Sequence, residues 1–241
     1  MKNLIIQIYC SLDNFSEANR IPKHDEIKEL STSLVKLYAD RCEADYILFD
    51  TPVINFRHPT YERFRLWEES YWCDTYDQVL YLDTDIFIWP ETPNIFEEYP
   101  GKEFKIAEHW NKEKKFRSLD KEFLNSDITT GDFVGYKHKD LFEISFNAGM
   151  FIITKESRDI MLPYLNYRDS LNTSDDSKIL HRLLLDSKVP YLYLPRQWNA
   201  KNMTRGNSYF SHLWGTKKIS DPNMQPILNA REILDVENTE Q

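Results

Sequence analysis

Strand-like and helix-like patterns alternate through the first third of the chain. Apolar runs rich in β-branched residues predict buried strands over 4–9, 46–49 and 78–82. Apolar residues at three- and four-residue spacing predict a helix that begins near Asp25, and a second helix is expected over 61–72. This β-α-β-α-β order is typical of a parallel sheet covered by helices.

The later part of the chain is interrupted by a polar stretch. Residues 108–143 are basic and polar at their start, and we interpret them as an insertion or lid over one end of the sheet. After this stretch the pattern predicts two further strands and two further helices: 146–154, 155–165, 175–187 and 189–194. We therefore expect one α/β domain over 1–220, followed by a peripheral tail over 221–241.

Composition narrows the class of protein. The chain has 241 residues, 41% of them hydrophobic and 14% aromatic, which is enough for a sizeable core. Its net charge of −9 argues against a general nucleic-acid partner. Its apolar runs are too short for a transmembrane segment, and its first apolar run is too short for a signal peptide. The three scattered cysteines give no disulfide framework, so we expect a cytoplasmic protein.

The six glycines exclude the glycine-rich phosphate-binding loops. No three of them form G-x-G-x-x-G, and Phe96 stands where a P-loop that ends in Gly101 and Lys102 needs its first glycine. The patterns H-E-x-x-H, C-x-x-C and G-x-S-x-G are also absent from the sequence. If the chain binds phosphates, a divalent metal is the obvious substitute for such a loop.

A pair of aspartates is the sharpest chemical feature. Asp83 and Asp85 flank Thr84 directly after the predicted strand 78–82, and in an extended chain their carboxylates point to the same side. Like charges so close together repel unless a cation lies between them. Ligands also bind at the carboxyl ends of strands in α/β sheets, and oxygen ligands suit Mg²⁺ or Mn²⁺. The alternative is an acidic turn that only ends a strand.

Two further motifs accompany the aspartate pair. Asn147 to Gly149 precede an apolar run, and His212, Gly215 and Lys218 form an H-x-x-G-x-x-K pattern. A histidine can ligate a metal, a glycine permits close backbone approach, and a lysine can bind phosphate. Each motif alone is also compatible with a core strand, a structural histidine or a solvated lysine.

Taken together and in this order, the motifs resemble those of the metal-dependent GT-A glycosyltransferases, specifically the glycogenin-like and galactosyltransferase-like enzymes of family 8. The matched pieces span nearly the whole chain, from residue 4 to 218, and include these segments: 61–65, 76–85, 146–153, 175–176 and 212–218. The resemblance implies a GT-A fold, with a central, mostly parallel sheet flanked by helices, in a single catalytic domain.

The resemblance also implies the metal and phosphate ligands. Asp83, Asp85 and His212 match the residues that hold Mn²⁺ against the diphosphate of the donor, with Mg²⁺ as the alternative ion. Lys218 matches the phosphate-binding lysine, and Gly215 lies close to it.

The other implied site residues contact the donor or the reacting sugar. Arg63 matches a basic residue that contacts the donor, with Arg65 as its rival. Asp175 and Asp176 fall near the anomeric carbon as candidate catalytic residues, although the family often has Asp-Gln there. The remaining donor-binding positions are the following: Tyr9, Cys10, Ser11, Thr84, Asn147, Ala148 and Gly149.

The implied reaction is transfer of a sugar from a nucleotide-diphosphate donor, expected to be a UDP-sugar, to a hydroxyl of a glycan or another acceptor, with retention of configuration. Two alternatives stay open. One is another metal-dependent nucleotide-sugar enzyme, a hydrolase or a nucleotidyltransferase. The other is a non-catalytic sugar-nucleotide-binding module.

Overall fold

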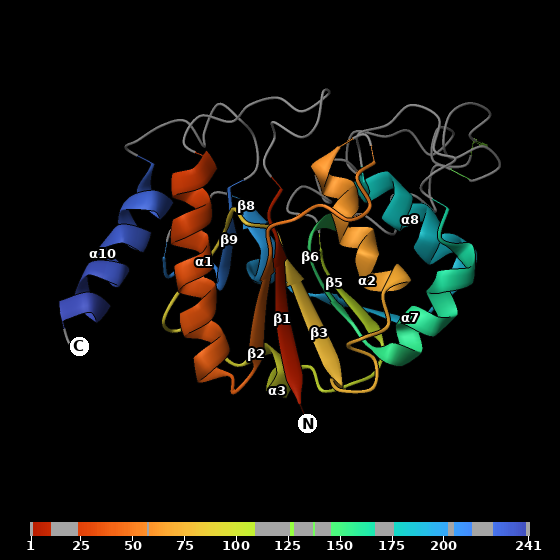
Figure 1. Cartoon of the computed structure of the whole chain (residues 1–241), viewed down its shortest axis with the longest axis horizontal. Coiled ribbons are helices and arrows are strands. Elements are labelled where there is room, and N and C mark those ends of the chain that lie inside the picture. Colours follow the sequence, from red (N-terminus) through yellow and green to blue (C-terminus); the bar gives the residue numbers. More distant parts are fainter. Residues whose placement is uncertain are drawn as a thin grey trace.

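A computed structural model gives the fold of most of the chain. It describes the following residues: 2–10, 24–56, 58–108, 126–127, 137, 146–166, 176–201, 205–213 and 224–239. Their strands form a six-stranded sheet and a three-stranded sheet (Figure 1). The larger sheet contains, in spatial order, β2 (Asp45–Phe49), β1 (Asn3–Ile8), β3 (Gln78–Leu82), β6 (Phe146–Ile153), β5 (Phe104–Glu108) and β7 (Tyr191–Leu194). The smaller sheet contains β4 (Ile86–Ile88), β9 (Phe210–His212) and β8 (Ala200–Lys201).

Strand direction in the larger sheet agrees with the expected α/β class. β1 pairs in parallel with both β2 and β3, and β5 pairs in parallel with β7. β6 runs antiparallel to β3 and β5, and this reversal joins the two parallel groups. The predicted β-α-β-α-β order thus holds at the start of the chain, and the mostly parallel central sheet flanked by helices is confirmed.

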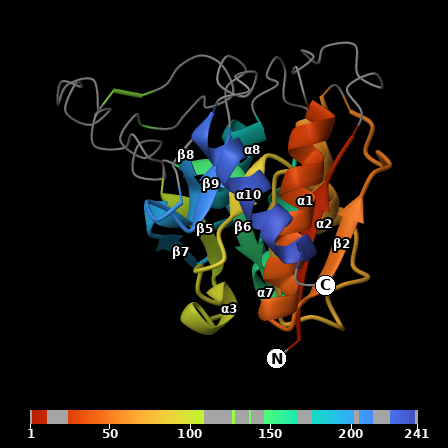
Figure 2. The same cartoon turned by 90° about the vertical axis from the view of Figure 1, so that its left-hand side faces the viewer.

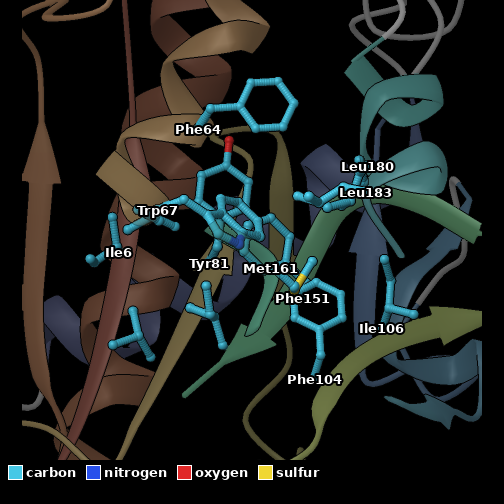
Figure 3. Close-up of a cluster of buried hydrophobic side chains, with 14 of the residues drawn as sticks. Ile6, Phe64, Trp67, Tyr81, Phe104, Ile106, Phe151, Met161, Leu180 and Leu183 are labelled. Atoms are coloured by element: carbon cyan, nitrogen blue, oxygen red, sulfur yellow. The ribbon is translucent and has the colours of Figure 1, made fainter. Parts of the chain in front are cut away.

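One face of the larger sheet is covered by α2 (Arg65–Glu68), α7 (Lys155–Met161) and α8 (Asp176–Ser187). Aromatic side chains fill this layer, and Figure 3 shows Trp67, Tyr81 and Phe151 together at its centre. The rings of Tyr81 and Phe151 stack with their centroids 4.8 Å apart. Because these side chains are almost fully buried, the core fixes the position of the β3 backbone that leads to the aspartate pair.

The other face is covered by α1 (His24–Arg41), α3 (Ile95–Glu98) and the smaller sheet. α10 (Gln225–Thr239) lies alongside α1 (Figure 2). Leu34 of α1 and Ile227 and Ala230 of α10 belong to one buried hydrophobic cluster. Residues 225–239 of the expected tail therefore form a helix that packs on α1. No helix in the described ranges is long and apolar enough to cross a membrane.

The helix expected over 61–72 is present but ends earlier, at Glu68, and its first part is wound as a 3₁₀ helix. A 3₁₀ helix, η2 (Pro59–Phe64), is followed by the single turn of α2. Every residue from Tyr61 to Trp67 is buried, and the aromatic side chains of Tyr61, Phe64 and Trp67 belong to the core on this face of the sheet.

Candidate metal centre

The two sheets meet at the aspartate pair. β3 ends at Leu82, the turn carries Asp83 and Asp85, and β4 begins at Ile86. β4 pairs antiparallel with β9 so that Ile86 lies opposite His212. The backbone N–H of Leu213 donates to the carbonyl oxygen of Asp85 at 2.9 Å. This strand pairing brings His212 next to the aspartates, although it lies far away in sequence.

The side chains of Asp83, Asp85 and His212 converge. His212 Nε2 lies 3.1 Å from Asp85 Oδ1 and 3.6 Å from Asp83 Oδ2. One ligand atom from each residue lies within 4.8 Å of the others. His212 is 3% exposed whereas the two aspartates are 23% and 22% exposed, so the cluster opens on its aspartate side. Two carboxylates and one imidazole form a donor set that fits a divalent ion such as Mn²⁺ or Mg²⁺.

The cluster depends on the small size of Gly149 in β6. A Cβ atom at this position would lie 2.1 Å from Cε1 of His212 and 2.6 Å from Oδ2 of Asp83. The Gly149 carbonyl oxygen also accepts a hydrogen bond of 2.8 Å from the backbone N–H of Asp83. A glycine therefore ties β6 to the aspartate turn while leaving space for two side chains of the cluster.

Asp83 is oriented by two donors on its other oxygen. Its Oδ1 accepts from the Tyr81 hydroxyl at 2.7 Å and from Arg63 Nη2 at 3.0 Å. Arg63 is buried, its Nη1 donates to the carbonyl oxygen of Ala148, and its guanidinium lies 5.2 Å from the centroid of the Tyr81 ring. These contacts occupy Oδ1 and leave Oδ2 facing His212.

Ionisation of Asp85 is governed by opposing effects. Burial of its carboxyl group favours the neutral acid, but the charge of His212 and the hydrogen bond from it outweigh burial and hold the pKa of Asp85 below its usual value. Asp85 is therefore a carboxylate near neutral pH, as a metal ligand must be.

A cavity of about 150 Å³ adjoins the aspartates and contains several predicted donor-binding residues. Its walls include Tyr9, Cys10, Arg63 and Thr84 together with the aspartate pair. Burial raises the pKa of Cys10 to about 12, so this side chain remains a thiol. These residues come from widely separated segments of the sequence, and the structure brings them to one cavity.

Two histidines of this cavity were missed from the sequence. The ring of His24 stacks on Tyr9 with centroids 5.1 Å apart, and burial lowers the pKa of His24. His58 Nδ1 accepts from the backbone N–H of Thr60 and caps η2. His24 is the first residue of α1, the element that follows β1 in the chain. Its position directly before the predicted helix start near Asp25 was the sequence signal that could have identified it.

The structure separates Arg63 from its rival. Arg65 forms an ion pair with Glu69 at 2.9 Å, and its guanidinium lies 3.9 Å from the centroid of the Phe49 ring. Of the two arginines, it is Arg63 that forms an ion pair with Asp83. Arg65 instead joins α2 to β2.

The remaining predicted site residues divide into two groups. In β6, Asn147 and Ala148 lie beside Gly149, and Asn147 contacts Asn199 (described below). The structure does not describe the other predicted site residues: Ser11, Asp175, Gly215 and Lys218. It describes the backbone of Asp176 at the start of α8 but not its side chain.

Comparison with solved structures places the chain in the GT-A glycosyltransferase fold, as the motifs had implied. A glycosyltransferase involved in glycosylation of the major capsid of PBCV-1 matches with a TM-score of 0.57 and 12% identity, over 97% of this chain and 98% of that one. The galactosyltransferase LgtC, in complex with donor and acceptor sugar analogues, matches with a TM-score of 0.57 and 15% identity, over 98% of this chain and 95% of that one. At these identities the similarity establishes the fold. No known family and no curated protein matches the chain by sequence.

Proposed function

We propose that this chain is a metal-dependent glycosyltransferase that moves a sugar from a nucleotide-diphosphate donor to a hydroxyl of an acceptor. The observation that carries the proposal is the convergence of Asp83, Asp85 and His212 beside a cavity in a GT-A fold. The structural neighbour LgtC was solved with donor and acceptor sugar analogues, and we extend that class of ligand to this chain.

The charges of the site suit the departure of a diphosphate. A divalent ion held by Asp83, Asp85 and His212 would offset the negative charge that develops on the leaving group. Mn²⁺ is the proposed ion and Mg²⁺ the alternative, because an imidazole ligand suits Mn²⁺ better. Arg63 contributes a fixed positive charge to the same site, 3.0 Å from Asp83 Oδ1. Lys218 is proposed as a further phosphate ligand.

The remaining residues would bind the donor and the reacting sugar. Asp175 or Asp176 would act near the anomeric carbon, with retention of configuration. The 108–143 segment would form a lid on a catalytic domain that spans 1–220. In addition to Arg63 and Lys218, the proposed donor-binding residues are the following: Tyr9, Cys10, Ser11, Thr84, Asn147, Ala148, Gly149 and Gly215.

A thermal-shift panel of nucleotide sugars, recorded with and without Mn²⁺, tests the donor. Since a ligand that binds the folded state raises its melting temperature, a UDP-sugar with Mn²⁺ should give the largest shift. A larger shift from a guanosine- or cytidine-linked sugar would contradict the choice of uridine.

Product analysis with the best donor then separates the candidate functions. A transferase forms a glycoside when a hydroxyl acceptor is present, a hydrolase releases free sugar, and a nucleotidyltransferase transfers the nucleotide. A binding module shows a thermal shift and no product. Glycoside formation that requires the metal is the expected result, and free sugar alone would refute the proposal.

A further inference from the structure

A buried asparagine outside the ligand triad contacts the histidine. Asn199 is the last residue of η4 (Arg196–Asn199) and is 2% exposed. Its Oδ1 lies 2.8 Å from Nδ1 of His212, on the side of the ring away from the aspartates. We infer that Asn199 is a positioning residue that fixes the tautomer of His212, so that the lone pair of Nε2 faces Asp83 and Asp85. This inference rests on the proposed metal site.

The orientation of the Asn199 amide follows from backbone groups of known polarity. The Gly149 N–H can only donate, and it donates to Asn147 Oδ1 at 2.9 Å. The carbonyl oxygen of Asn147 can only accept. Both Asn147 oxygens lie 3.3 Å from the same atom of the Asn199 amide, so that atom is the nitrogen Nδ2. The other end of the amide, which faces His212, is therefore the oxygen.

The amide oxygen then determines where the imidazole carries its proton. A carbonyl oxygen only accepts, so Nδ1 of His212 must be the donor in the 2.8 Å hydrogen bond. Without a metal, Nε2 donates to Asp85 Oδ1, 3.1 Å away, and Asp83 Oδ2 lies 3.6 Å from the same atom. When a metal replaces that proton, the Nδ1–H held by Asn199 leaves the lone pair on Nε2, toward the aspartates. In the opposite tautomer the Nδ1 lone pair would face Asn199 Oδ1, and the Nε2–H would block the position of a metal.

The series of hydrogen bonds thus runs from β6 to the metal ligand. Gly149 N–H fixes Asn147, Asn147 fixes Asn199, and Asn199 fixes His212. Partners of this kind commonly orient metal-binding histidines and contribute about 10- to 100-fold to metal affinity. The competing view is that Asn199 only ties η4 to β6, in which case its loss would lower stability and leave the ring tautomer unchanged.

Two substitutions of Asn199 separate these views. Asn199→Ala removes both the acceptor for His212 and the donor for Asn147. Asn199→Asp keeps an acceptor for the Nδ1–H but places its second carboxylate oxygen where Nδ2 now lies 3.3 Å from two oxygens of Asn147. A purely structural asparagine therefore predicts that the aspartate variant is impaired in both stability and metal binding. A positioning asparagine predicts that the aspartate variant loses stability and retains metal binding.

The first measurement is the affinity of the full chain for Mn²⁺, from the electron paramagnetic resonance signal of free Mn²⁺, without donor or acceptor. Asn199→Ala should weaken binding by about 10- to 100-fold, and Asn199→Asp should stay within about threefold of wild type, because carboxylates are common partners of metal-bound histidines. Asn94→Ala is the matched control: it removes the 3.1 Å cap to Phe96 N of α3 and should leave Mn²⁺ affinity unchanged.

The second measurement is ¹⁵N NMR of His212 in the chain loaded with Cd²⁺, a diamagnetic divalent ion. Wild type and Asn199→Asp should show a metal-bound Nε2 and a protonated Nδ1, and Asn199→Ala should lack this signature at a Cd²⁺ concentration that saturates wild type. The inference is overturned by a metal bound through Nδ1 in wild type, by wild-type affinity in Asn199→Ala, by an Asn199→Asp variant that loses as much affinity as Asn199→Ala, or by a wild type that binds no Mn²⁺. A chain that shows the expected dependence on Asn199 and yet transfers no sugar would refute the proposed function and leave this inference intact.

Discussion

Replacing Gly149 by alanine should disrupt the metal centre without unfolding the protein. The added Cβ would lie 2.1 Å from Cε1 of His212, and ordinary contact begins at 3.4 Å, so the ring must move by about 1.3 Å. Metal–ligand distances tolerate only about 0.2 Å, so a ring displaced this far cannot remain a ligand. Since Asn199 holds Nδ1 at 2.8 Å, the displacement also strains that hydrogen bond. We expect Mn²⁺ affinity and metal-dependent transfer to fall at least about tenfold.

The assay compares Gly149→Ala with Gly101→Ala, in Mn²⁺ affinity and in melting temperature. A Cβ at Gly101 would lie 2.0 Å from Glu103 Oε2, an equally severe overlap, but that carboxylate ends a flexible, exposed side chain that can turn away. Gly101→Ala should therefore keep wild-type Mn²⁺ affinity. If Gly149→Ala also keeps it, or if both variants lose it equally, the steric argument for Gly149 is wrong.

Two further predictions follow from buried charges. Burial lowers the pKa of Lys105 to about 8 from its ordinary 10.5, so between these values the unfolded chain binds a proton that the folded chain lacks. The difference in free energy of unfolding between wild type and Lys105→Met should therefore increase in favour of wild type from pH 8 toward pH 10, by up to about 1.4 kcal/mol per pH unit. Denaturant titrations at several pH values measure this difference, and a difference that does not change with pH would contradict the prediction. Arg63→Ala should weaken donor binding because Arg63 contacts Asp83, whereas Arg65→Ala should lower only the melting temperature; equal losses of donor binding would refute this distinction.

Local sequence patterns were sufficient for the elements that form the larger part of the sheet. The runs at 4–9, 46–49 and 78–82 became β1, β2 and β3. β1 and β3 are buried along their whole length, as their continuous apolar runs predict, whereas β2 lies at the edge of the sheet and is only partly buried. The short strands β4 and β9 were not predicted. Three-residue strands carry no readable period, and they are stabilised by pairing between segments that lie far apart in the sequence.

The same limit applies to the candidate site. Asp83, Asp85 and His212 were identifiable because carboxylates and an imidazole have recognisable metal chemistry and stand in motifs. Asn199 carries no such signal in the sequence. Its role depends on the direction of its amide group, and only the folded backbone of β6 sets that direction.

The proposed metal centre is tested by sugar transfer in wild type and His212→Ala as a function of Mn²⁺ concentration. If Asp83, Asp85 and His212 form one metal centre, wild type transfers sugar only with the metal, and His212→Ala loses about 100-fold or more in transfer at any Mn²⁺ concentration up to saturation of wild type. Circular dichroism and melting temperature should show that the fold survives the substitution. A His212→Ala protein with full transfer activity and unchanged Mn²⁺ affinity would show that His212 is not a ligand of the metal and that the three residues do not form one metal centre.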